Sequence, residues 1–485
     1  MSFNSAEFPF FFALIVVVYF LTPYRHRWKI LLAGSYLFYM AWKPAYLSWL
    51  IGITLLDYSC ALRMCKTPSR RERRPWLLLS IGGNLALLFV FKYAGFANET
   101  LQALSHALHI SYGLPLFKIL LPLGISFHTL QTIGYSIDVY RGTREPEKHL
   151  GLFALYVSFF PQLVAGPIER STTLLPQFRR DFDFEYARVV EGLRLMLWGF
   201  FKKIVIADRL SLYVDSVYGN PSGYGALPTI MATIFFAFQI YCDFSGYSDI
   251  AIGAARVMGY RLTLNFNRPY IAQSIREFWR RWHISLSTWF RDYVYVAMGG
   301  NRVSTIKWAA IIFVVFLLSG IWHGANWTFF IWGLIHGGYY IVGRASAAPR
   351  ARWREFLDRV GAGAARQALS IGGTFLLVCF AWIFFRAANL GDALQLVENL
   401  GRHGDIPGIQ TGVLISSLFG YKGLALNGLL IAFLLVAEGL VKEQGVVSYW
   451  SAKPLAWRWG IAYAIVFAMI VLGNIGKNEF IYFQF

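Results

Sequence analysis

The sequence predicts an all-α, polytopic integral membrane protein, and three observations carry this prediction. Only 15% of the 485 residues are charged, against roughly 25% in an ordinary soluble domain. Hydrophobic residues make up 56% of the chain. They fall into long runs without Asp, Glu, Lys or Arg, several of which meet or approach the ~17 to 25 residues that a membrane-spanning helix requires. These runs are residues 9–24, 30–42, 77–91, 119–137, 308–335 and 369–385.

The chain up to about Phe91 is predicted to form four spans. Residues 1–8 contain no basic residue and carry Glu7, so we interpret the first run as a retained span and not as a cleavable signal peptide. Short turns are expected at 24–29, 43–45 and 67–75. Two of these turns are basic and are therefore predicted to be cytoplasmic, which places the N-terminus outside. The basic residues are Arg25, Arg27, Lys29, Lys66, Arg70, Arg71, Arg73 and Arg74.

The middle third of the chain is less regular than its ends. Residues 92–115 are predicted to be a polar, external connection before the apolar run 116–137. The apolar segment 151–168 is interrupted by Pro161, Gly166 and Pro167, a pattern typical of a re-entrant element. Irregular backbone at membrane depth persists only where protein or a cavity satisfies its polar groups. We therefore expect an interior chamber.

The last third begins with the 28-residue run 308–335, which is long for one straight helix and predicts a broken or steeply tilted pair. Residues 344–366 carry many charges and predict a surface amphipathic helix. Three further apolar stretches follow, and the total is ~11–13 transmembrane or re-entrant helices. Those stretches lie near 369–385, 427–440 and 459–472.

The charge and cysteine content narrow the choice of partners. The net charge of +19 would suggest nucleic-acid binding in a soluble protein, but here the basic residues lie mainly at the ends of apolar runs. Anchoring to anionic membrane lipid explains them better, and we expect no nucleic acid partner. The four cysteines have no metal-type spacing and are predicted to be small buried hydrophobes, so no metal site is expected. They are Cys60, Cys65, Cys242 and Cys379.

The densest polar cluster within apolar sequence is residues 277–292, which contain His283. Forty residues later His323 stands in the middle of the apolar run. An imidazole at membrane depth is costly to bury and is by default a candidate for function. The alternative is a histidine that only hydrogen-bonds to a neighbouring helix for packing, and that is how we interpret His336.

Four motifs surround the two histidines, and they resemble the signature of the membrane-bound O-acyltransferase family. Within that family the likeness is to the bacterial alginate O-acetyltransferase branch, and it covers nearly the whole chain in order. The motifs are FWRRWHISLS (278–287), RDY (291–293), GGNR (299–302) and WHG (322–324), and further matching segments are 121–126, 137–142, 164–167, 243–249, 265–270 and 479–485.

The resemblance implies a catalytic role for His323, supported by His283. Transfer of acetyl from a thioester to a hydroxyl group needs a base for the alcohol proton, and neutral imidazole suits that task. A donor must also face the developing oxyanion, and His283 or Asn326 are the candidates. Three arginines either cap spans at the cytoplasmic interface or bind the phosphates of coenzyme A. They are Arg280, Arg281 and Arg291.

The resemblance also implies a topology for the reaction. The expected donor is acetyl-coenzyme A from the cytoplasm, with no bound cofactor, and the expected acceptor is an exopolysaccharide such as alginate or cellulose. A separate periplasmic acetyltransferase is the implied partner, and the bacterial inner membrane is the implied location. One membrane domain, 1–485, is predicted around a central tunnel. Its parts are N-terminal spans (1–115), a catalytic core with re-entrant elements (116–345) and C-terminal spans (346–485).

Two other functions stay open at this point. A transporter or flippase of an acyl donor or lipid-linked sugar would need no chemistry at His323, although it would be expected to show inverted repeats, which we do not detect. An O-acyltransferase for D-alanine or fatty acyl groups would keep the enzyme and change the acyl group. The sequence leaves the polysaccharide, the immediate acceptor, any acyl-enzyme and the oligomeric state undetermined.

Overall fold

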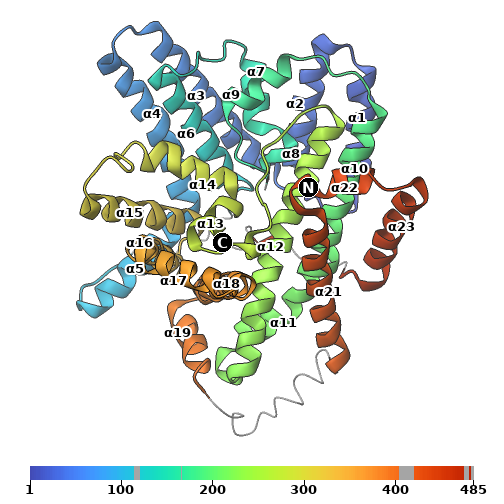
Figure 1. The fold of residues 1–485 in the computed structure, drawn as a ribbon. Helices are drawn as coiled ribbons and strands as arrows, with labels where there is room; N and C mark the ends of the chain where they lie inside the picture. The colour runs from blue at the N-terminus through green and yellow to red at the C-terminus, as the bar shows by residue number, and fades with distance from the viewer. Residues whose placement is uncertain (114–120, 165, 403–419, 475–479, 482–485) are drawn as a thin grey trace. The chain divides into compact units, whose positions relative to one another are not determined.

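The computed structural model describes residues 1–113, 121–164, 166–402, 420–474 and 480–481, and Figure 1 shows their helices. Every regular element in these residues is helical, which confirms the predicted all-α class. Seven helices of the described residues are long and apolar enough to cross a membrane, which confirms the polytopic character. They are Pro44–Lys66, Arg70–Ala107, Ala226–Val257, Thr305–His323, Gly363–Arg386, Lys422–Val441 and Leu455–Leu472.

The chain divides into two compact units. Unit 1 contains Met1–Met196 and Tyr247–Thr263, and unit 2 contains Leu197–Gly246 and Leu264–Phe485. The predicted single domain with its three parts stays a prediction, as does the total of ~11–13 helices, which included shorter and re-entrant elements.

Unit 1 is built from the N-terminal helices and the end of α12. The helices are α1 (Glu7–Leu21), α2 (Tyr24–Met40), α3 (Leu47–Lys66), α4 (Arg70–Leu88), α5 (Ala94–Ala107), α6 (Ile125–Arg141), α7 (Leu150–Ser158), α8 (Phe160–Leu163), α9 (Ser171–Leu174), most of α10 (Tyr186–Phe200) and the last residues of α12 (Ala226–Val257).

The four predicted N-terminal spans fall on α1 to α4, of which α3 and α4 belong to the seven candidate membrane spans. Two of the turns between them are shorter than expected, whereas the turn between α2 and α3 is longer. Because α2 begins at Tyr24 and α4 at Arg70, most of the predicted basic turn residues lie in the first turns of these helices. The predicted connection 92–115 is helical over Ala94–Ala107, since a π turn at Phe89–Tyr93 carries α4 on into α5. Residues 114–120 lie outside the described part of the chain.

The polar core of unit 1 lies between α3, α4 and α6, which pack together. The carboxylate of Asp57 is buried and accepts hydrogen bonds from Ser80 Oγ at 2.6 Å and Asn84 Nδ2 at 2.9 Å. Thr132 Oγ1 in turn donates to Asn84 Oδ1 at 2.9 Å. Hydrogen bonds between helices of this kind satisfy polar groups that the apolar surroundings would leave without partners.

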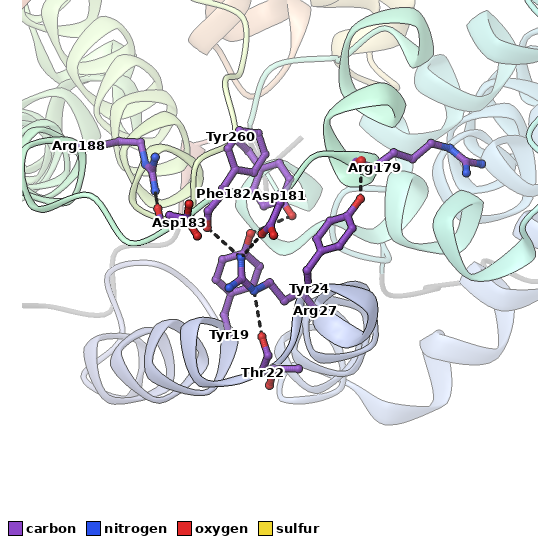
Figure 2. Close-up of polar contacts among 10 residues, drawn as sticks. All are labelled: Tyr19, Thr22, Tyr24, Arg27, Arg179, Asp181, Phe182, Asp183, Arg188 and Tyr260. Atoms are coloured by element: carbon purple, nitrogen blue, oxygen red, sulfur yellow. Dashed lines mark hydrogen bonds and ion pairs between the residues drawn. The ribbon is translucent and has the colours of Figure 1, made fainter.

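A second polar cluster in unit 1 joins the start of α2 to the segment before α10 (Figure 2). The Arg27 guanidinium donates to Thr22 O at 3.0 Å, Asp181 Oδ1 at 2.9 Å and Phe182 O at 2.8 Å. It also lies 5.0 Å above the ring of Tyr19. Arg27, one of the basic residues near the start of α2, therefore also forms a structural ion pair with Asp181.

Unit 2 contains the rest of the chain. Its helices are the end of α10, the π-helix η4 (Phe201–Ala207), α11 (Asp208–Tyr218), most of α12, α13 (Ile275–Arg281), α14 (Ile284–Phe290), α15 (Thr305–His323), α16 (Trp327–Ala345), α17 (Ala347–Arg359), α18 (Gly363–Arg386), α19 (Leu390–Asn399), α21 (Gly420–Val441), α22 (Gly445–Ser451) and α23 (Leu455–Leu472).

The interruptions predicted within two apolar segments are present. The segment 151–168 breaks at Phe159, between α7 and α8, and not at the predicted Pro161, which lies within α8. The run 308–335 breaks at residues 324–326, between α15 and α16.

The predicted surface helix is α17, in which no residue is buried. Of the cysteines, Cys65 is exposed, so its predicted burial is wrong, because it faces outward near the C-terminal end of α3.

Helices α15 and α16 pack closely because two glycines face backbone across the contact. A Cβ on Gly320 would meet Phe329 O at 2.3 Å, and one on Gly333 would meet Phe316 O at 2.5 Å. These distances leave no room for a methyl group. Small residues let helix backbones approach in this way in membrane proteins.

We predict opposite effects for two alanine substitutions on α16. Gly333→Ala should lower the free energy of unfolding by about 1–3 kcal/mol, since the methyl group must push α15 away. Gly338→Ala should leave stability unchanged or raise it by up to about 1 kcal/mol, because nothing lies within 4 Å of its Cβ and alanine favours helix. Thermal unfolding of the detergent-solubilised variants measures both. Equal midpoints would contradict the packing described for Gly333.

Candidate active site

His323 is the last residue of α15 and is almost fully buried. Its imidazole is enclosed by aromatic rings, with centroids 4.9 Å from Trp322, 5.1 Å from Trp332 and 5.2 Å from Phe385. Because the helix ends at this residue, the side chain lies beside a break in the backbone and not in the middle of a continuous helix. The ring is therefore desolvated and held in place by packing.

His283 stands at the N-cap of α14 and is completely buried. Its ring centroid is 6.4 Å from that of His323 and 6.0 Å from that of Trp322. The structure thus brings together the two histidines that the sequence singled out, from two different helix ends of unit 2.

The backbone of His283 is left-handed, with φ of +42°, a conformation that costs a residue other than glycine about 1–3 kcal/mol. Asn265 holds the neighbouring backbone in place. Its carbonyl accepts from Ile284 N at 2.9 Å, and its side-chain Oδ1 accepts from Ser285 Oγ at 2.6 Å. These hydrogen bonds hold the strained backbone of His283 in place, and the backbone in turn sets the direction of its imidazole.

Phe244 on α12 packs edge-on against His283, with centroids 4.6 Å apart. Phe480 packs against Phe244 at 5.5 Å. The preceding residue of α12, Asp243, forms a buried ion pair with Lys203 Nζ at 2.5 Å and accepts from Ile481 N at 2.8 Å. The carboxylate of Asp243 therefore anchors the elements behind His283.

Asn326 caps α16, and its side-chain amide is engaged at both ends. Oδ1 accepts from Thr328 N at 3.1 Å, and Nδ2 donates to Ala388 O at 2.8 Å. The residue thereby stabilises the break after His323 and ties it to the segment that follows α18. The Nδ2 group of Asn326 could donate to an oxyanion only if its hydrogen bond to Ala388 O were broken.

The three candidate arginines have different surroundings. Arg280 is exposed. Arg281 is held by Glu277 at 2.9 Å and by Asn267 O at 3.2 Å. Arg291 is exposed and pairs with Asp292 at 2.7 Å, and this hydrogen bond raises the pKa of the Arg291 guanidinium above its ordinary value. Arg280 is therefore the one whose charge is most available to a ligand.

One side chain beside His323, Trp332, was not predicted from the sequence. Trp332 is fully buried against the imidazole, and His336, interpreted from the sequence as structural, lies one turn farther along α16 with centroids 4.9 Å from Trp332. The short break folds α16 back along α15, so residues of its first turns return to His323. The described residues hold no group of three or more His, Cys, Asp or Glu that could bind a metal.

Comparison with known proteins identifies similar chains. The family model of the membrane-bound O-acyltransferase family matches residues 149–352. A probable alginate O-acetylase of Pseudomonas aeruginosa is 39% identical over 449 residues, which cover 88% of this chain and 82% of that protein. One from Azotobacter vinelandii is 38% identical over 94% of this chain and 87% of its own length. A peptidoglycan O-acetyltransferase of Helicobacter pylori is 36% identical over 76% and 73% respectively.

The left-handed backbone of His283 gives a prediction about stability. His283→Gly should be more stable to unfolding than His283→Ala by about 1 kcal/mol, because only glycine adopts this conformation without steric cost. Thermal unfolding of the purified variants measures the difference. At the buried Ser319 within α15, the same pair of substitutions should show the reverse order, since alanine is favoured inside a helix. The same order at both positions would argue against strain at His283.

Proposed function

Because this chain belongs to the membrane-bound O-acyltransferase family and is an O-acyltransferase, we propose that it moves acetyl groups from acetyl-coenzyme A to hydroxyl groups of an exported polysaccharide. The single observation that carries the proposal is the pair of buried imidazoles, His323 and His283, whose centroids are 6.4 Å apart. The similarity to alginate O-acetylases over most of the chain supports the choice of acetyl and of a polysaccharide.

The proposed chemistry uses His323 as general base. Its imidazole takes the proton of the acceptor hydroxyl while the oxygen attacks the thioester carbonyl carbon. The tetrahedral intermediate then collapses, the carbon–sulfur bond breaks, and the thiol leaves with the proton that the imidazole had taken. The aromatic rings around His323 exclude water and favour the neutral form of the base. His283, at the N-terminal end of α14, supports His323 at the C-terminal end of α15.

The proposed donor and acceptor lie on opposite sides of the membrane. Basic residues begin α2 and α4, and the positive-inside rule then places these ends in the cytoplasm and the N-terminus in the periplasm. A tunnel through the helices would let a cytoplasmic thioester and an external acceptor reach His323. We propose a bacterial inner-membrane location and a periplasmic acetyltransferase partner that receives the acetyl group.

The polysaccharide that finally carries the acetyl group has two candidates. An exopolysaccharide of the alginate or cellulose type fits the similarity to alginate O-acetylases over most of the chain, whereas the Helicobacter pylori relative, a peptidoglycan O-acetyltransferase, favours the glycan of the cell wall. Relatives named teichoic acid D-alanyltransferases match only about half of the chain, as the one from Bacillus subtilis does over 54%. Acetyl is therefore preferred over D-alanine.

We predict that His323→Ala abolishes acetyl transfer. In a host lacking its own copy, acetate bound to exported polysaccharide and to peptidoglycan should fall at least ~100-fold, the usual contribution of a general base. His106→Ala, which removes an exposed histidine of α5, serves as the control and should keep activity at equal membrane levels. Unchanged acetate in the His323 variant would favour a transporter without chemistry at this residue.

A second prediction concerns coenzyme A binding by Arg280. Arg280→Gln should raise the KM for acetyl-coenzyme A roughly tenfold with little change in kcat, since one charge-assisted phosphate contact is lost. Arg359→Gln removes an exposed arginine of α17 and should leave KM unchanged. Initial rates with membranes and labelled acetyl-coenzyme A measure both. Equal KM values for the two variants and the wild type would assign Arg280 to membrane anchoring instead.

A further inference from the structure

Helix α16 carries a buried N–H group directly beside His323. Trp332 is completely buried, and its ring meets the His323 imidazole edge to face at 86°, with centroids 5.1 Å apart. No described residue accepts a hydrogen bond from Trp332 Nε1. A buried tryptophan usually pairs its indole N–H, so this donor calls for an explanation.

The same helix face carries another such group one turn away. His336 Nδ1 accepts from Trp279 Nε1 at 3.3 Å, which leaves the proton of the neutral ring on Nε2. In the described part of the chain no acceptor faces that Nε2. Trp279 occupies Nδ1 of His336 and ties this ring to α13, whereas the indole N–H of Trp332 has no acceptor among the described residues.

An unmade hydrogen bond at a buried donor lowers the stability of the folded protein. Native proteins retain such groups where a ligand or a reaction uses them. The neighbour of Trp332 is the imidazole to which we assign the acceptor proton, and the reaction at that imidazole develops negative charge on an oxygen within a few ångströms. A neutral N–H held rigidly by packing can donate to that oxygen without reorganising.

Resting on the proposed function, we infer that Trp332 is a further catalytic residue, whose Nε1–H donates to the acyl carbonyl oxygen of the thioester as that oxygen becomes an oxyanion. The acceptor oxygen forms a bond to the carbonyl carbon, its proton goes to His323, and the carbonyl π pair moves to the oxygen that Trp332 binds. When the oxyanion collapses, the carbon–sulfur bond breaks and the thiolate takes the proton from His323. The products are an ester and a thiol.

The other donors suggested by the sequence are less well placed for this role. The Nδ2 group of Asn326 already donates to Ala388 O at 2.8 Å, and the bond holds the helix break. His283 packs against Phe244 on α12. Trp332 combines complete burial, an N–H that no described residue accepts, and direct ring contact with His323.

The test is Trp332→Phe, which keeps an aromatic ring and removes only the N–H and part of the ring system. Membranes from a host lacking its own copy supply their natural acceptor, and radiolabelled acetyl-coenzyme A is the probe. The maximal rate per amount of protein should fall by about 10²–10³, while the KM for acetyl-coenzyme A stays within about twofold, as expected for an interaction made only in the transition state.

Trp382→Phe is the matched control. Trp382 on α18 is also completely buried and stacks on Trp332 at 6.1 Å, so its substitution reports the effect of lost packing. It should reduce the maximal rate far less than Trp332→Phe. If Trp332→Phe does not accumulate in the membrane, benzothienylalanine at position 332, which replaces the N–H by sulfur in a ring of the same shape, takes its place.

The outcomes separate this inference from the proposed function. A maximal rate for Trp332→Phe within about threefold of wild type, an equal loss in Trp382→Phe, or a rise in KM alone would overturn the role of Trp332. If His323→Ala abolishes transfer in the same membranes while Trp332→Phe does not, the inference about Trp332 fails and the proposed function stands. If His323→Ala leaves transfer intact, the proposed function itself fails.

Discussion

Inside an apolar interior, every polar group of the backbone must find its partner within the protein, and this constraint shapes the candidate site. A helix that ends there exposes unpaired carbonyl and N–H groups. At the break between α15 and α16, Asn326 accepts from Thr328 N in the first turn of α16 and donates to Ala388 O in the segment after α18. The break persists because these bonds form, and it places His323 at a helix end beside a second broken element.

Close packing of α15 on α16 follows from the same break. With Gly320 and Gly333 facing backbone carbonyls, the two helices approach until the first turns of α16 enclose the end of α15. Trp332 then lies against His323 from one side, and Phe385 of α18 contacts the imidazole as well. The packing that holds the helices together therefore also fixes the position of the His323 imidazole and shields it from water.

Much of this arrangement could be predicted from residues close together in sequence. The length of the apolar run 308–335 predicted a broken or tilted pair, and the first helix does end at His323. The local motifs also singled out His283. The connection predicted at 92–115 was less well defined, because its polar residues lie on one helix, α5, that continues α4 through a π turn. Polarity alone does not distinguish an external loop from an external helix.

The remaining features depend on contacts between residues far apart in the chain, which no local pattern records. The position of His283 rests on Phe244 from α12, and Phe244 in turn packs on Phe480 near the C-terminal end. The ion pair of Asp243 with Lys203 holds the same support. Spacing could not reveal that Arg281 is committed to Glu277 and Asn267 O while Arg280 stays exposed. Because both imidazoles stand at helix ends, their mutual distance is set by these distant contacts, and a change far from either histidine can alter that distance.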